Sequence, residues 1–385
     1  MATGVIDRLT SAALEELQAR YRDRWRGVVE AKAEGRPVVG FLGDVPRALA
    51  EAAGLFAVQV TAPVLAATPD ADLYMDDILS PETHALFQAV HDGAFSGLDL
   101  LVLTRAYDKL FYYLKEGLRI GLGAAFPPLH MFDLMQSRRP AVETYNRRQL
   151  DQLIDQLQRI GGRSISDAAL ADALQRQAAV QDLQRRLMVQ RRRGVVSGVE
   201  ALEAIGAGRS LDARDYAHLL AAFVDDLERE PTPAGAQARL LVASAEPLDS
   251  PRLHALLESA GAQVVAEDDV WGSRAADEFV TDALSPKEAL FQAAWRGAVG
   301  AGVYPPEARH AWFDREALAD DVDAVIFYVP PSDRMFGWDY PQLKDRLDRA
   351  GKLSLLIRGD VERDKTAVTA QARTFVASLP KRAAS

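Results

Sequence analysis

Two stretches of this chain, about 205 residues apart, are near copies of each other, and this repeat constrains the fold more than any other feature. Residues 79–89 read Leu-Ser-Pro-Glu-Thr-His-Ala-Leu-Phe-Gln-Ala, and residues 284–293 read Leu-Ser-Pro-Lys-Glu-Ala-Leu-Phe-Gln-Ala. Four further pairs of segments match in the same order: 38–42 with 240–244, 52–58 with 259–265, 98–103 with 322–327, and 129–133 with 355–360. Ordered agreement of this kind indicates two related domains.

Each repeated unit has the pattern of an α/β domain. In the first unit, an apolar run over 36–43 ends at a glycine, a helix follows from Pro46 to Gly54, and a second apolar run covers 55–60. Strand, helix and strand joined by short connections are typical of a right-handed crossover in a parallel sheet. We therefore predict an α/β protein with two related open parallel-sheet (doubly wound) domains joined by a long helical segment.

Helical patterns and turn residues set the expected boundaries. The predicted units are 1–35 with an N-terminal helix that ends at Gly35, 36–140 as the first α/β domain, 141–235 as a helical connecting segment, and 236–385 as the second α/β domain. Ser166 is expected to begin a helix, and 231–235 has the composition of a linker. The basic residues of the helical segment are predicted to form a solvated helix face, with contact to an anionic partner as the alternative: Arg185, Arg186 and Arg191 to Arg193.

Composition argues against several classes of function. The chain has 385 residues, a formal net charge of −10, six histidines and no cysteine. The acidic charge argues against nucleic-acid binding, and the lack of a signal pattern or a long apolar stretch argues against membrane insertion, so we expect a cytoplasmic protein. Disulfides, thiolate metal sites and thiol nucleophiles are excluded, and the histidines lack the paired spacing of a metal site.

Ligands of open parallel sheets bind beyond the carboxyl ends of the strands, so the loops there hold the candidate site residues. Three consecutive acids, residues 267–269, stand at one such strand end. Crowded carboxylates raise one another's pKa, which suits general acid catalysis, and capping of the next helix is the alternative. The catalytic candidates are Glu267, Asp269, Arg274, Asp108 and Lys109, and the substrate-binding candidates are Gly43, Asp44, Arg105, Tyr107, Trp271 and Ser273. A glycine-rich dinucleotide fingerprint and a P-loop are both absent from the sequence.

The chain resembles the family of 2-hydroxyacyl-CoA dehydratases and benzoyl-CoA reductases over roughly residues 36–360. The resemblance rests on an ordered set of segments: 39–46, 52–54, 98–108, 131–133 with Glu143 and Tyr145, 161–166 and 267–274. It implies two-domain α/β subunits that pair as heterodimers, bind an acyl-CoA thioester and hold a [4Fe-4S] cluster on three cysteines. It also implies a separate ATP-driven activator that delivers an electron.

The resemblance places the three cysteines at positions that hold other residues here. The counterparts are Gly43 or Leu42, Met75 or Asp76, and Tyr107, and none of them supplies a thiolate. We therefore expect no cofactor bound by this chain, and a [4Fe-4S] cluster only on a partner subunit. The family's chemistry requires a strong one-electron donor beside the thioester, so the chain alone is not expected to be catalytic.

Three functions are compatible with these features. The first is a cluster-free subunit of a heteromeric 2-hydroxyacyl-CoA dehydratase or benzoyl-CoA reductase-like complex, which supports the thioester site of a cysteine-bearing homologous subunit in a heterodimer. The second is a stand-alone acyl-CoA or small-ligand binding protein without redox chemistry. The third is an enzyme with non-redox acid–base chemistry at the catalytic candidates. The aromatic run at 335–340 contains residue types that anchor interfaces, although a loop that packs its own aromatic side chains is an equally common explanation.

Overall fold

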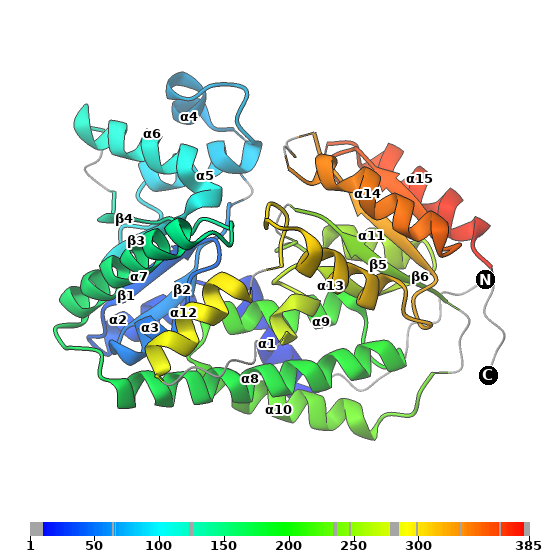
Figure 1. Cartoon of the computed structure of the whole chain (residues 1–385), viewed down its shortest axis with the longest axis horizontal. Coiled ribbons are helices and arrows are strands. Elements are labelled where there is room, and N and C mark those ends of the chain that lie inside the picture. The colour runs from blue at the N-terminus through cyan, green and yellow to red at the C-terminus, as the bar shows by residue number, and fades with distance from the viewer. Residues whose placement is uncertain are drawn as a thin grey trace.

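The computed structural model describes residues 11–63, 65, 67–122, 126–233, 237–245, 248–277, 285–297, 299–331, 333, 335–361 and 363–380. Figure 1 shows two sheets side by side, each with its own helices, above long helices that run beneath both. Among the described residues, no helix combines the length and the apolar character needed to cross a lipid bilayer. The first ten residues, where the sequence shows no signal pattern, lie outside the described residues.

Each sheet has four parallel strands, and the strand order is equivalent in the two sheets. The first sheet has the order β2-β1-β3-β4, with β1 (Val38–Leu42), β2 (Phe56–Gln59), β3 (Leu100–Thr104) and β4 (Leu129–Phe132). The second has the order β6-β5-β7-β8, with β5 (Ala238–Ala243), β6 (Ala262–Asp268), β7 (Ala324–Tyr328) and β8 (Leu353–Ile357). The predicted pair of related parallel sheets is confirmed.

Alternating side chains make both faces of the first sheet apolar, as expected for a parallel sheet covered on both sides. Val39 and Phe41 face one core, and Val38 and Leu42 face the other. The first core is covered by α3 (Arg47–Ala52), α7 (Pro140–Gly161), the start of α8 (Asp167–Arg193) and α12 (Pro286–Arg296). The second is covered by α2 (Arg26–Ala33), α4 (Pro69–Tyr74), α5 (Pro81–His91) and α6 (Asp108–Arg119).

The second sheet is also covered on both faces. One face packs against α11 (Arg252–Ser259) and α15 (Lys365–Ser378), and the other packs against α13 (Glu307–Ala317) and α14 (Phe336–Arg349). Each sheet is therefore the middle layer of a helix–sheet–helix arrangement, and the two arrangements are related.

The N-terminal segment contains two helices instead of the single predicted one. Helix α1 (Ala12–Arg22) ends at Asp23, and α2 begins at Arg26, whose backbone N–H donates to the Asp23 carboxylate at 3.1 Å. The chain changes direction here because α1 packs on the helical segment whereas α2 packs on the first sheet. The predicted end at Gly35 is confirmed, since this residue has a φ of 74°, which glycine adopts without strain.

The connecting segment is helical, as predicted, and Ser166 caps α8 by accepting from the Ala169 N–H at 3.2 Å. Its further helices are α9 (Gly198–Ala207), the short η2 (Gly208–Ser210) and α10 (Ala213–Arg229). These helices share a core with α1, and α8 and α10 form the base seen in Figure 1. Part of the predicted linker, residues 234 and 235, lies outside the described residues.

The prediction of a solvated basic face was wrong for much of the arginine cluster. Arg191 is fully buried, while Arg186 pairs with Asp225 and Glu228, and Arg192 pairs with Glu316 and Asp321. These arginines hold helices together, because acids from other elements neutralise them.

The two copies of the sequence repeat pack on opposite faces of the same sheet. In both copies the serine caps the helix and proline follows in its first turn. Helix α5 contributes Phe87 to one core of the first sheet, whereas α12 contributes Phe291 and Trp295 to the other. Helix α12 thus belongs by sequence to the second half of the chain and by packing to the first sheet, as Figure 1 also shows. Leu284 and the rest of 278–284 lie outside the described residues.

Candidate functional site

A cleft lies between the carboxyl ends of the strands of the two sheets. On the first-domain side it is lined by the start of α5, including Glu82. On the second-domain side it is lined by Arg252 at the start of α11, Tyr328 at the end of β7 and Asp360 in the loop after β8. Its volume is about 170 Å³, below the roughly 300–1,000 Å³ typical of sites that enclose a whole small molecule. The cleft has room for part of a ligand such as an acyl-CoA.

A polar group stands at the carboxyl edge of the first sheet. Arg105 follows β3 in the short helix η1 (Arg105–Tyr107), and its Nη1 donates to both carboxylate oxygens of Asp133 at 2.9 and 3.1 Å. The hydroxyl of Tyr145 on α7 donates to the same carboxylate at 2.8 Å. Burial, the first cause, and the hydrogen bond to Asp133 both raise the pKa of Tyr145. Tyr107 connects this group to the cleft, because its hydroxyl donates to the Glu82 carboxylate at 3.1 Å.

The residues at the counterpart positions of the family's cluster ligands do not fit an iron–sulfur cluster. Gly43 has a φ of 89°, and a Cβ added there would lie 1.9 Å from the Thr104 hydroxyl oxygen. Met75 is buried in a core of the first sheet, and the Tyr107 hydroxyl is hydrogen-bonded to Glu82. Thiolates are the usual ligands of such clusters, and the chain has none.

This geometry predicts that cysteine alone does not restore the cluster. A Gly43→Cys/Met75→Cys/Tyr107→Cys variant is expected to bind no iron–sulfur cluster after anaerobic incubation with iron and sulfide. The substitution at Gly43 alone should cost at least about 1–2 kcal/mol, because a side chain is strained at positive φ. Visible absorbance and iron content of the refolded protein test this. Stoichiometric cluster binding by the variant would show that these three side chains converge after all.

Glu267, the first of the three acids, is fully buried at the end of β6. It forms an ion pair with Arg191, and the His254 ring lies 3.5 Å from its other oxygen. Burial alone would raise the pKa of Glu267, but the charge of Arg191 and the hydrogen bond with His254 lower it below its ordinary value. A Cβ at Gly272 would lie 2.0 Å from the Glu267 carboxylate, so only glycine lets the following loop pack against it.

The other two acids are also enclosed. Asp268 is fully buried between Arg309, at 2.8 Å, and Arg274, at 3.3 Å. Asp269 is 4% exposed, and burial raises its pKa to about 7 although the charge of Arg274 opposes this. None of the three acids lines the cleft. The catalytic role of the three acids stays a prediction, and the burial and ion pairs of Glu267 and Asp268 favour a structural role for those two.

The remaining predicted residues of this segment also face inward. Trp271 is buried, and the guanidinium groups of Arg24 and Arg209 lie 4.9 and 5.3 Å from its ring. The Ser273 hydroxyl, in the short helix η3 (Ser273–Ala276), accepts from the Glu267 N–H at 3.1 Å. None of residues 267–274 lines the cleft, whereas Tyr107 of the first domain contacts Glu82, which does.

Asp44 and Lys109 are exposed, and Asp108 is half-buried at the start of α6. Asp133 and Tyr145 were not among the predicted site residues, although Asp133 directly follows a strand and that position was a usable signal. Glu82 and Arg252 could not be found in this way, because the cleft brings them together from opposite halves of the chain.

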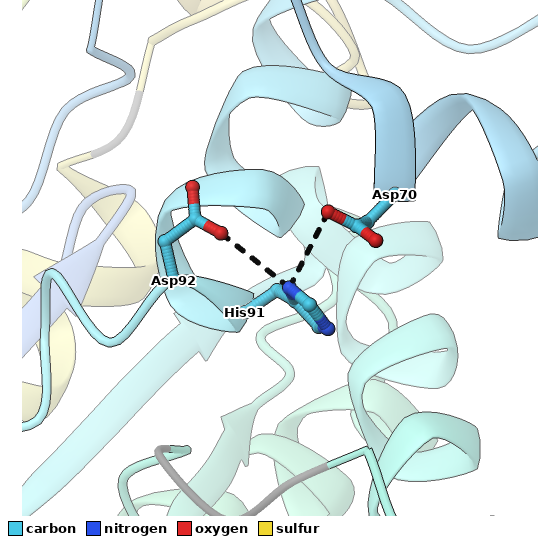
Figure 2. A group of neighbouring side chains, drawn as sticks. All are labelled: Asp70, His91 and Asp92. Atoms are coloured by element: carbon cyan, nitrogen blue, oxygen red, sulfur yellow. Dashed lines mark hydrogen bonds and ion pairs between the residues drawn. The ribbon is translucent and has the colours of Figure 1, made fainter.

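The sequence did not predict a grouping of Asp70, His91 and Asp92, which Figure 2 shows around the end of α5. The His91 Nδ1 lies 3.7 Å from the Asp70 carboxylate and 3.5 Å from that of Asp92. The same two oxygens accept from the buried Gln88 amide at 2.9 Å each. Hydrogen bonds within the group thus account for its geometry, which joins α4 to α5.

A larger cavity of about 310 Å³ lies between α1, α2 and α10. Four of its charged side chains pair within it, since Arg36 contacts Asp212 at 2.7 Å and Arg20 contacts Glu30 at 2.6 Å. Arg36 precedes β1, so this cavity is at the opposite end of the first sheet from the cleft.

Two parallel sheets whose carboxyl ends border a shared cleft, with α12 of the second half packed on the first sheet, define a two-domain α/β protein. A sequence model described as 2-hydroxyglutaryl-CoA dehydratase, D-component, matches residues 43–379. The chain therefore belongs to this dehydratase family, and the resemblance seen in the sequence is confirmed.

The chain is also similar to the (R)-phenyllactyl-CoA dehydratase beta subunit of Clostridium sporogenes. The two are 22% identical over 235 residues, which cover 58% of this chain and 61% of that subunit. The matched region thus spans about three-fifths of the relative.

Proposed function

We propose that this chain is a cluster-free subunit of a heteromeric 2-hydroxyacyl-CoA dehydratase-like complex that supports the thioester site of a cysteine-bearing homologous partner. The observation that carries this proposal is the combination of an intact interdomain cleft with unsuitable ligand positions at Gly43, Met75 and Tyr107. The scaffold of the family is retained, whereas the residues for one-electron chemistry are absent. Similarity to a relative named as a beta subunit supports a role within a complex.

The size of the cleft favours this proposal over a stand-alone acyl-CoA binding protein. A volume of 170 Å³ admits only part of a thioester, which suits a subunit that completes a site together with a partner. The burial of Glu267, Asp268 and Asp269 argues against independent acid–base chemistry, because substrate does not reach these carboxylates without local opening.

Co-expression with a cysteine-bearing family member tests the proposal. We expect the two chains to co-purify as a coloured complex whose iron content corresponds to the cysteine-bearing subunit. This chain purified alone should be colourless and inactive. Turnover of a 2-hydroxyacyl-CoA by this chain alone, or failure to associate with any cysteine-bearing member encoded beside it, would contradict the proposal.

An exposed apolar surface near the domain junction is where we propose that the partner binds. This surface, the Trp338 patch, comprises Tyr304, Met335 and Trp338, which are 59%, 51% and 84% exposed. The Met335 methyl group lies against Gly302, and the backbone of Tyr304 bonds to Gln136 and Arg138 of the first domain. The segment that carries Tyr304 is therefore bonded to the first domain, so the patch lies beside the domain junction. The other two residues of the aromatic run at 335–340 are not part of this surface, because Phe336 is buried and Tyr340 packs on Phe327.

Trp338→Ala is expected to weaken assembly with the partner about ten-fold or more, as for a tryptophan at the centre of an interface. The free energy of unfolding of the isolated chain should change little, because the side chain is exposed. Tyr112→Ala is the matched control, since Tyr112 is a 67% exposed aromatic residue on α6. Analytical ultracentrifugation of the co-expressed pair measures the effect. If both variants weaken assembly equally, or if neither variant weakens it, the interface lies elsewhere on the chain.

A further inference from the structure

We infer that Arg105, held by Asp133 and Tyr145, forms an anion-binding subsite for a carboxylate or phosphate group of the ligand. The inference rests on the proposed function, because it assigns a part of the thioester to the carboxyl edge of the first sheet. It adds to that function the chemical class of the group that Arg105 binds, and it assigns Asp133 and Tyr145 as positioning residues.

The geometry leaves much of the Arg105 guanidinium available. Its Nη1 alone contacts Asp133, and its Nε and Nη2 donate to no other described residue. The side chain is 58% exposed, whereas Asp133 is 20% exposed. A guanidinium anchored at one nitrogen still presents a fork of donors that matches the paired oxygens of a carboxylate or phosphate.

Asp133 and Tyr145 fix the orientation of this arginine. Both oxygens of Asp133 accept from Arg105, and one of them also accepts from the Tyr145 hydroxyl. Three elements of the chain therefore converge on one carboxylate: the end of β3, the end of β4 and the first turns of α7. An arginine whose rotamer is already fixed loses less conformational entropy when it binds a ligand.

The formal charges around Arg105 balance, because the cations Arg105 and Lys109 stand beside the acids Asp108 and Asp133. Lys109 is exposed one turn further along, and α6 begins between them without a side-chain cap, so the positive end of its dipole lies at the same edge. Asp108 and Asp133 oppose this field. The subsite is therefore expected to recognise a specific anionic group by its hydrogen bonds more than by net charge.

Three thioesters distinguish the two sources of the anion. Glutaryl-CoA carries a terminal carboxylate and phosphates, butyryl-CoA carries phosphates only, and butyryl-pantetheine carries neither. Their binding to the full chain, alone and in complex with its partner, is measured by calorimetry for the wild type and for Arg105→Gln. If Arg105 binds the acyl carboxylate, the variant should lose about ten-fold in affinity for glutaryl-CoA alone. If it binds phosphate, both CoA esters should weaken equally, and butyryl-pantetheine should not.

Matched variants keep the test specific. Arg119→Gln is the control, because Arg119 is exposed at the end of α6, the helix that follows η1, and also pairs with a carboxylate, that of Glu116. Arg105→Lys should retain part of the affinity, since it keeps the charge and loses the fork. Tyr145→Phe leaves every charge in place and should lower the affinity for the same ligands as Arg105→Gln, by a smaller factor.

Unchanged affinity of Arg105→Gln for both CoA esters, or equal losses in Arg119→Gln, would overturn the subsite and leave the proposed complex intact. If no thioester binds, inorganic phosphate should still raise the melting temperature of the wild type and not that of Arg105→Gln. That result would keep the subsite and reject thioester binding. The absence of both effects would reject the subsite, whereas subunit assembly is tested independently by co-purification.

Discussion

Arg191→Met is expected to lower the free energy of unfolding by roughly 3–5 kcal/mol, as for removal of one partner from a buried ion pair. Arg191 and Glu267 are both fully buried, and the guanidinium also donates to the Val264 carbonyl at 2.8 Å. Without Arg191, the Glu267 carboxylate keeps the His254 ring, 3.5 Å away, as its remaining ion-pair contact among the described residues. It must then remain charged in the interior or take up a proton, and either costs free energy. Urea denaturation followed by circular dichroism measures the loss.

The double variant Arg191→Met/Glu267→Met is the matched control. Two apolar side chains leave no uncompensated charge, so most of the lost stability should return. This pair of variants also separates a structural role of Glu267 from the acid–base role predicted from the sequence. A change below about 1 kcal/mol in Arg191→Met, together with lost function of the double variant, would favour chemistry over stability at this position.

Asp269→Asn is expected to stabilise the protein at about pH 8 by up to about 4 kcal/mol relative to the wild type, and to have little effect near pH 4. Burial raises the pKa of Asp269 from 3.8 to about 7. The folded state therefore holds this proton more tightly than the unfolded state. The stability that the protonated carboxyl contributes is present below the unfolded pKa of 3.8 and is lost as the pH rises through about 7. Asparagine carries no charge at either pH and avoids that loss.

Stability curves of both proteins at the two pH values test this prediction. The asparagine oxygen can still accept from the Trp271 N–H, which donates to Asp269 at 2.6 Å, so the loop geometry should persist. The sign of the difference is the decisive result, because most substitutions of buried residues destabilise. A variant that is equally destabilised at both pH values would mean that Asp269 titrates in its ordinary range.

The fold could be predicted in some detail because its signals are local. Apolar runs such as 38–42 mark strands, the Ser-Pro starts at 80–81 and 285–286 mark helices, and the repeat relates the two sheets. The break between α1 and α2 was missed, since it depends on which core each helix contacts. The placement of α12 was also beyond reach, because its sequence matches α5 while its packing partners lie in the other half of the chain.

The site was less predictable than the fold. The rule for strand ends selected Arg105 and Tyr107, of which Tyr107 contacts Glu82 in the lining of the cleft. The same rule selected Glu267 and Asp269, which do not line the cleft. The rule does not distinguish these cases, because burial of the second set depends on Arg191 and Arg309, which are distant in sequence. Asp133 follows a strand as well, and its role emerges only when Arg105 and Tyr145 converge on it.

The exchange of α12 has a consequence for how this architecture can be divided. Phe291 and Trp295 complete an apolar surface that the first 233 residues leave uncovered. An N-terminal fragment that ends at the linker would therefore expose this apolar surface to solvent. The C-terminal fragment would carry α12 without the sheet against which it packs. The first sheet thus depends on a helix from the other half of the duplication, so we expect neither half to fold properly as an isolated module.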